Sequence, residues 1–286
     1  MNYALCIIIF FAHLACFAQH SPVDIWAGTD VKKHVMLTPY IAQGENNPCV
    51  IVCPGGSYFW HDTENEGVKV AEWLQQNGVS AFVLNYRTAY VPAFIFRTRL
   101  VVRGNQYPDP QNDLQQAILL VKDHAALYGI DTTRVGAMGF SAGGHLVMSV
   151  AEKYDSPRCR PAFVAPIYPV VSFTADCTHK RSRRGLLGEY RKRKAKYREA
   201  LSLEKNVPAD CPPVFLVNCV DDPIVDYRNS ELLDSALTAQ GVRHKYIQYV
   251  TGGHGFGASD DKGTAECRKW KEEFLKWMKE LLVVSG

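Results

Sequence analysis

Short apolar runs alternate with longer amphipathic stretches along most of this chain. Such alternation is typical of βαβ units, in which buried parallel strands are joined by helices. The pattern predicts strands over residues 31–38, 49–53, 81–86, 135–140, 163–168, 214–220 and 245–250. It predicts helices over residues 66–76, 111–128, 142–152, 230–240 and 264–282. We therefore expect an α/β fold with a mainly parallel central sheet and helices on both faces.

Two segments do not follow this rhythm. Residues 89–108 show no clean period, and residues 173–207 contain dense basic runs at 180–184 and 191–198. We interpret the second segment as a small inserted cap that carries a solvated helix. The alternative is a docking surface for an acidic polymer or lipopolysaccharide.

Length, composition and net charge indicate one domain and no particular class of partner. The chain has 286 residues, of which 47% are hydrophobic, which suits one domain with a large core. Its formal net charge is only +3, so nothing in the balance indicates nucleic acid or an anionic membrane as a partner.

The N-terminus is an apolar run that is too short for a convincing membrane span and fits a signal peptide. Cleavage after Ala18 would place small residues, Cys16 and Ala18, before the cut. The run departs from the usual signal-peptide pattern because it has no Lys or Arg at its start. The alternatives are a lipoprotein signal that ends at Cys16 and a buried N-terminal strand or helix. We expect residues 1–18 to be a signal peptide, residues 19–286 a single domain, and the protein to be secreted or periplasmic.

The cysteines do not form a recognisable framework. Seven would remain after removal of the signal peptide, an odd number, and none has zinc-site spacing. One disulfide, joining Cys211 to Cys159 or Cys177, is the candidate pairing.

The strongest chemical signal is the sequence Gly-Phe-Ser-Ala-Gly at residues 139–143, which fits the G-x-S-x-G pattern. A strand-like run precedes it and a helix-like run follows it. A sharp turn between strand and helix needs glycines on both sides and would hold the hydroxyl of Ser141 at a helix N-terminus. Ser141 is therefore the candidate nucleophile.

A serine nucleophile needs a base, and in this arrangement the acid and then the histidine follow the serine in the chain. His254 lies in the glycine-rich loop 251–257, after the last predicted strand. Asp221 and Asp222 follow the strand 214–220, and either carboxylate could orient the imidazole. We favour Asp222, which begins an Asp-Pro-Ile-Val turn, and keep Asp221 as the alternative acid.

The backbone must also stabilise a developing oxyanion. The N–H of Ala142, at the start of the predicted helix, is one candidate donor. The loop Pro-Gly-Gly-Ser-Tyr at residues 54–58 follows an earlier strand, and there Gly56 or Ser57 would be the second donor. No metal or organic cofactor is expected.

At these motifs the chain resembles the α/β-hydrolase superfamily, and more closely the bacterial esterase/lipase group that includes acetylxylan esterases and feruloyl esterase-like proteins. The similar segments span about residues 50–257. The resemblance implies a triad of Ser141, Asp222 and His254. Ser57 departs from the pattern, because this group commonly has a third glycine at that position.

The resemblance implies a secreted serine esterase that removes acyl groups, acetyl first and feruloyl second, from plant polysaccharide or oligosaccharide. Small-molecule or oligosaccharide esters would be its partners. A serine peptidase of the prolyl-oligopeptidase type is one alternative, although the chain has no room for the large extra domain of those proteins. A non-catalytic carbohydrate-binding protein on the same fold is the other.

Overall fold

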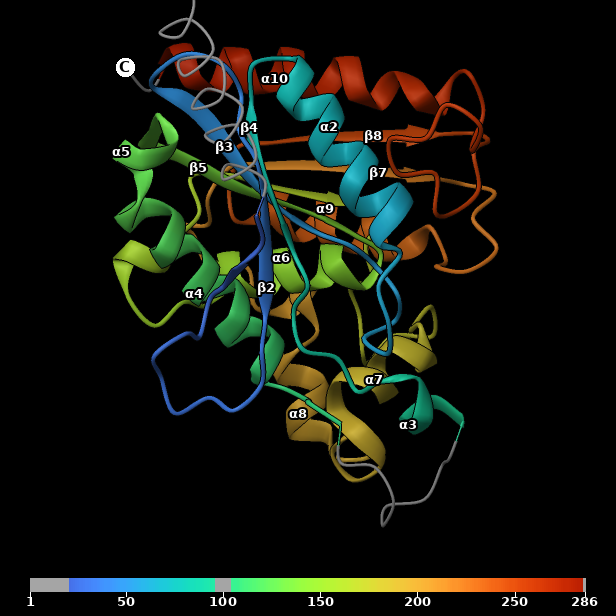
Figure 1. The fold of residues 1–286 in the computed structure, drawn as a ribbon. Coiled ribbons are helices and arrows are strands. Elements are labelled where there is room, and N and C mark those ends of the chain that lie inside the picture. The colour runs from blue at the N-terminus through green and yellow to red at the C-terminus, as the bar shows by residue number, and fades with distance from the viewer. Residues whose placement is uncertain (1–20, 96–103, 285–286) are drawn as a thin grey trace, which may run out of the picture.

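The computed structural model describes residues 21–95 and 104–284, so the predicted signal peptide lies outside the described residues. A single sheet of eight strands crosses the molecule in the order β1-β2-β4-β3-β5-β6-β7-β8 (Figure 1). Its strands are β1 Val23–Asp24, β2 Met36–Tyr40, β3 Asn47–Cys53, β4 Ser80–Leu84, β5 Ile130–Phe140, β6 Val164–Ile167, β7 Val214–Cys219 and β8 His244–Tyr249. The pairings from β4 to β8 are parallel, whereas β1 and β2 pair antiparallel at one edge. The predicted, mainly parallel α/β fold is thereby confirmed.

Helices cover both faces of the sheet. They are α2 Lys69–Gln76, α3 Val91–Ile95, α4 Asp109–Asp123, α5 Ala125–Tyr128, α6 Ala142–Glu152, α7 Lys180–Arg191, α8 Ala195–Ala200, α9 Arg228–Ala239 and α10 Trp270–Val284. Short turns of other helical types occur at Glu64–Val68, Pro157–Cys159, Leu203–Lys205 and Cys267–Lys269. In Figure 1, α2 and α10 lie over one face, and α4, α6 and α9 belong to the other side.

Alternation along each strand divides the core into two layers. In β3, Val50 and Val52 belong to the cluster that contains α2 and α10, while Ile51 and Cys53 belong to the cluster with α4, α6 and α9. Successive side chains of a strand point to opposite faces. Because both faces are buried, β3 is apolar throughout its second half instead of alternating with polar residues.

The first predicted strand was misplaced. The strand begins at Met36 rather than at residue 31, because pairing with β4 starts where Leu37 lies opposite Leu84. Just before it, the backbone of Val35 instead bonds Ile25 and the carboxylate of Asp24. The two-residue strand β1 was not predicted, since so short an element leaves no periodic signal.

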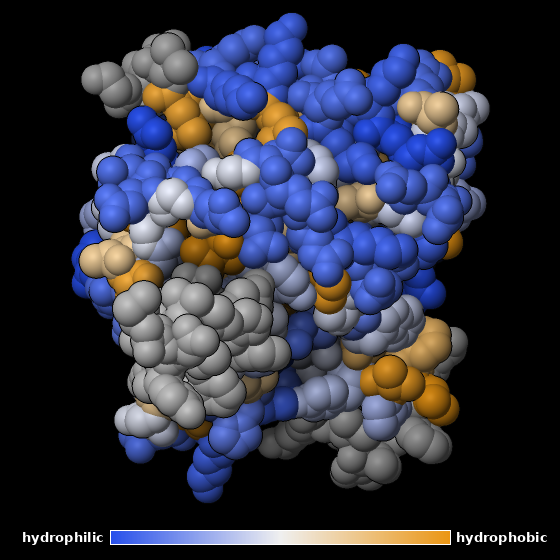
Figure 2. All heavy atoms as spheres, turned by 45° about the horizontal axis from the view of Figure 1, so that its top comes forward, coloured by the Kyte–Doolittle hydropathy of each residue, from blue (hydrophilic) through white to orange (hydrophobic). Residues whose placement is uncertain are grey.

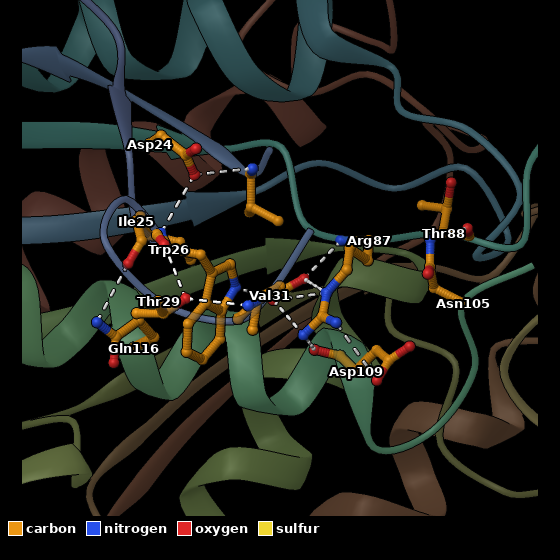
Figure 3. A network of polar contacts seen from close by, with 12 residues as sticks. Asp24, Ile25, Trp26, Thr29, Val31, Arg87, Thr88, Asn105, Asp109 and Gln116 are labelled. Carbon is orange, nitrogen blue, oxygen red and sulfur yellow. Dashed lines mark hydrogen bonds and ion pairs between the residues drawn. The ribbon is translucent and has the colours of Figure 1, made fainter. Parts of the chain in front are cut away.

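A network of polar contacts around Trp26 and Arg87 ties the N-terminal segment to the sheet and to α4 (Figure 3). The carboxylate of Asp113 is fully buried, lies 2.7 Å from a guanidinium nitrogen of Arg87 and accepts the indole N–H of Trp26, also at 2.7 Å. It further accepts the backbone N–H of Arg87. This carboxylate therefore fixes the chain where β4 ends.

The insert 173–207 forms α7, α8 and one 3-10 turn. The prediction of a solvated helix was wrong for the inner face of α7, where Leu186 and Leu187 are fully buried. Gly185 lies so close to the carbonyl oxygen of Ser57 that an added Cβ would be 2.3 Å from it. The helix therefore packs directly on the loop that follows β3.

The seven cysteines within the described ranges are all free and buried, so the disulfide considered for Cys211 is absent. Cys159 lies beside Ser156 in the turn at Pro157–Cys159, while the carbonyl of Cys177 accepts a hydrogen bond from Asn229. Cys159 and Cys177 thus have different surroundings, whereas Cys219 and Cys267 both lie against Gly252 as free thiols.

Among the described residues, no helix combines the length and the apolar character needed to cross a membrane. The face shown in Figure 2 is mostly hydrophilic, with apolar residues scattered over it.

Candidate active site

Ser141 occupies the turn between β5 and α6. Its backbone has φ 53° and ψ −114°, an unfavourable conformation for a residue with a Cβ. A Cβ at Gly139 would lie 2.1 Å from the carbonyl oxygen of Gly143, and one at Gly143 would lie 2.0 Å from that of Cys53. Gly139 is therefore required for the turn to close on itself, and Gly143 for it to pack against β3.

His254 and Asp222 come together beyond the ends of β8 and β7. His254 Nδ1 lies 2.6 Å from Asp222 Oδ2, and the Asp222 side chain is only 1% exposed. The other carboxylate oxygen accepts the N–H groups of Ile224 and Val225. A carboxylate held in this way fixes the orientation of the imidazole.

The neighbouring Asp221 points elsewhere. Its carboxylate accepts the backbone N–H groups of Gly252 and Gly253, at 2.9 and 2.8 Å. It therefore orders the loop that carries His254 without touching the imidazole.

The ends of the parallel strands bring Ser141 and His254 to one edge of the sheet. Ser141 N–H donates to the carbonyl of Ile167 in β6, and the ring of the next residue, Tyr168, lies 4.6 Å from that of His254. In the described part of the chain, Ser141 Oγ and His254 are not hydrogen-bonded to each other. Such bonds are often long in unliganded enzymes and shorten when substrate binds.

The loop after β3 presents free N–H groups near Ser141. Within the described ranges, neither Gly56 N–H nor Ser57 N–H donates to a protein acceptor. Ala142 opens α6, and the N–H at a helix start has no partner within the helix. Ser57 has φ 58°, a left-handed conformation that glycine adopts more readily than serine.

Glu66 is a site residue that we did not single out from the sequence. Its carboxylate is 3% exposed, accepts the N–H of Gly55 at 2.6 Å and the hydroxyl of Tyr168 at 2.9 Å. The same tyrosine hydroxyl accepts the N–H of Gly257. One carboxylate thus links the loop after β3 to the loop that carries His254.

Burial raises the pKa of Glu66 to about 7, although the nearby His254 and the bond from Tyr168 act in the opposite direction. His179, directly before α7, is the second perturbed group at this edge. Burial, followed by the positive charges of Arg181 and His254, lowers the pKa of His179 to about 4.

In the parts of the chain that the structure describes, no group of three or more His, Cys, Asp or Glu side chains has an arrangement suited to a metal ion.

Comparison with known proteins defines the class. Residues 37–237 match the family model BD-FAE. The chain is 30% identical over 222 residues to an acetylxylan esterase of Xylanibacter ruminicola, covering 76% of this chain and 43% of that protein. It is also 30% identical to endo-1,4-beta-xylanase B of Butyrivibrio fibrisolvens, covering 75% of this chain and 33% of that protein. The chain therefore spans less than half the length of these curated relatives.

A solved structure agrees over nearly the whole chain. The acetyl ester-xyloside bifunctional hydrolase of Caldicellulosiruptor lactoaceticus superposes with a TM-score of 0.79 at 32% identity, covering 92% of this chain and 97% of that one.

Fold and relatives together place the chain among α/β-hydrolases that are similar to esterases. Within that class, the chain belongs to the BD-FAE family.

Proposed function

We propose that this protein is a serine esterase that removes acetyl groups from plant polysaccharide or oligosaccharide. The single observation that carries the proposal is the contact of 2.6 Å between His254 and Asp222 at the sheet edge where Ser141 sits in its strained turn. Two relatives, an acetylxylan esterase and an acetyl ester-xyloside bifunctional hydrolase, support the choice of acyl group and sugar.

In the proposed reaction, His254 takes the proton of Ser141 as Oγ attacks the ester carbonyl. Asp222 stabilises the imidazolium that forms. The N–H groups of Ala142 and of Gly56 or Ser57 bind the oxyanion. The sugar hydroxyl then leaves with the proton from His254, and water hydrolyses the acetyl-serine by the same route.

Acetate release from acetylated xylo-oligosaccharides tests this proposal. Ser141→Ala should abolish release, whereas Ser235→Ala, which changes an exposed serine on α9, should retain the wild-type rate. Ferulate release and p-nitrophenyl acetate hydrolysis are measured in parallel. Activity on p-nitrophenyl acetate alone would contradict the proposed carbohydrate substrate. Equal rates of acetate release by the two variants would contradict the serine mechanism.

We also propose that the protein is exported, on the basis of the apolar run in residues 1–18. Mass spectrometry of the protein recovered outside the cytoplasm should find an N-terminus after Ala18. Recovery of the uncleaved chain in the cytoplasm alone would contradict export.

A further inference from the structure

A strongly basic pocket lies beside the candidate active site. It has a volume of about 490 Å³, and Phe94 of α3 and residues of α7 and the following turn form its wall. Figure 1 shows α3 and α7 side by side, and Arg184 joins them by donating to the carbonyl of Ala93. Six cations line the pocket: Lys180, Arg181, Arg183, Arg184, Lys192 and Arg193.

The only carboxylate among the lining residues, Glu189, neutralises little of this charge. It already pairs with Arg184 and with Lys192, the latter at 2.6 Å. Within residues 21–95 and 104–284, the other four cations have no carboxylate at ion-pair distance. Like charges gathered without counterions are unfavourable unless an anion joins them.

Arg183 also has a buried nitrogen that lacks a hydrogen-bond acceptor. It donates to the carbonyl of Phe173, but its Nε–H is buried and donates to no acceptor in the described structure. A buried donor left unpaired costs free energy that a bound acceptor would recover. Burial and the positive charge of Arg198 lower the pKa of Arg183, as expected for a guanidinium that lacks an anion.

Arg181 connects the pocket to the ester site. Its Nε donates to Ser57 Oγ at 3.0 Å, and its guanidinium lies 5.5 Å from the ring centre of Trp60. Trp60 and Phe94 are in edge contact, with ring centres 5.5 Å apart. The route from the candidate oxyanion loop to the basic pocket therefore passes aromatic surface, which offers a rigid apolar contact for a sugar ring.

We propose that this pocket binds the carboxylate of a uronic acid residue, so that the preferred substrate is an acetylated acidic oligosaccharide. Planar guanidinium groups bind carboxylates through two parallel hydrogen bonds, and Arg181, Arg183 and Arg193 supply three such groups. The choice of an acetyl ester rests on the proposed function, whereas the carboxylate site does not.

The first test measures binding without catalysis. Calorimetry on Ser141→Ala protein would compare three unesterified xylo-oligosaccharides: neutral, bearing a glucuronate branch, and bearing a sulfate. The glucuronate compound should bind about tenfold more tightly than the neutral one, as expected for a charge-assisted bond, and added salt should reduce the difference. Equal affinities, or tighter binding of the sulfated compound, would overturn the assignment.

Matched variants locate the site. Lys180→Gln with Arg193→Gln removes two exposed cations from the pocket wall and leaves Arg181 and Arg183, so the preference for glucuronate should fall about threefold. Lys194→Gln with Lys196→Gln removes two exposed cations of the same insert outside the pocket and should keep the preference. Equal effects of the two double variants would show that overall charge, and not this pocket, determines the preference, and would overturn the proposed site.

The second test uses acetate release by the protein with Ser141 intact. For each variant, kcat/KM for the acetylated acidic oligosaccharide is divided by kcat/KM for the acetylated neutral one. This ratio removes differences in overall activity between the variants. This ratio should fall in the pocket double variant only. If the protein binds glucuronate but hydrolyses no ester, the carboxylate site is supported and only the proposed esterase function is overturned.

Discussion

At the scale of single residues, the two adjacent aspartates after β7 have different tasks. Asp222 contacts the imidazole of His254, whereas Asp221 orders the loop that carries it. Asp222→Asn should lower kcat for acetate release roughly 10⁴-fold, because an amide no longer holds the imidazole in the required tautomer. Asp221→Asn should cost less than about tenfold, because an amide oxygen still accepts from Gly252 and Gly253. Steady-state kinetics of both variants checks this, and equal losses would contradict the assignment of the acid.

The second prediction at this scale concerns Glu66. A carboxyl whose folded pKa is raised, here to about 7 from 4.5, contributes stability that is fully present below pH 4.5 and is lost as the pH rises through 7. The shift corresponds to roughly 3 kcal/mol in the free energy of unfolding. Urea unfolding at about pH 5 and about pH 8 should show that wild type loses most of this, about 2.5 kcal/mol, relative to Glu66→Gln.

The control for Glu66 is Glu45→Gln, which changes an exposed carboxyl and should follow wild type at both pH values. Parallel behaviour of wild type and Glu66→Gln would show that this carboxyl does not titrate differently in the folded protein.

These residues also show what sequence alone can reveal of the site. Ser141 and His254 stand in glycine-rich motifs whose spacing indicates a turn, so both were candidates from the start. The Asp-Pro-Ile-Val turn favoured Asp222 and left Asp221 as the alternative, because only the folded backbone decides where two adjacent side chains point. Glu66 was missed since it looks like an ordinary acid near a helix start, and its partner Tyr168 is 102 residues away.

At the scale of elements, the turn from β5 to α6 depends on contacts that cross between strands. Gly143→Ala would place a Cβ 2.0 Å from the carbonyl oxygen of Cys53 in β3, so backbone must move. We expect a loss of about 3 kcal/mol or more in unfolding free energy. Gly241→Ala has open space around the added Cβ, and only its φ of 67° opposes the change, so its loss should be about 1 kcal/mol.

Chemical denaturation of the two alanine variants measures this difference. Similar small losses would mean that the turn adjusts without strain and that Gly143 is not required by packing.

Element positions were largely predictable, since apolar runs mark buried strands. Their boundaries were not: the first strand depends on its pairing with β4, and the helix predicted over residues 111–128 divides at His124, where φ is −107°. The buried face of α7 was hidden by its basic residues. Long cationic side chains can lie half-buried over apolar neighbours while their charges stay near solvent.

At the scale of the whole molecule, stability depends on joining the N-terminal segment, β4 and α4 through one carboxylate. Asp113 is fully buried between Arg87 and Trp26, whereas Asp123, on the same helix, pairs with Arg158 at the surface with both side chains at least half exposed. Removing Asp113 leaves the buried Arg87 only a longer ion pair, 3.5 Å, with Asp109, so Asp113→Asn should lower the free energy of unfolding by about 3 kcal/mol.

Asp123→Asn should cost less than about 1 kcal/mol, because water and salt screen an exposed pair. Thermal and urea unfolding of both variants measures the contrast, and the fluorescence of Trp26 should report early release of the N-terminal segment in Asp113→Asn. Equal, small losses would show that water replaces the bonds of Asp113, and the segment before β2 would then be held by β1 pairing and apolar contacts instead. A large loss would explain how a two-residue edge strand stays in place: the ion pair, rather than the strand, anchors the chain there.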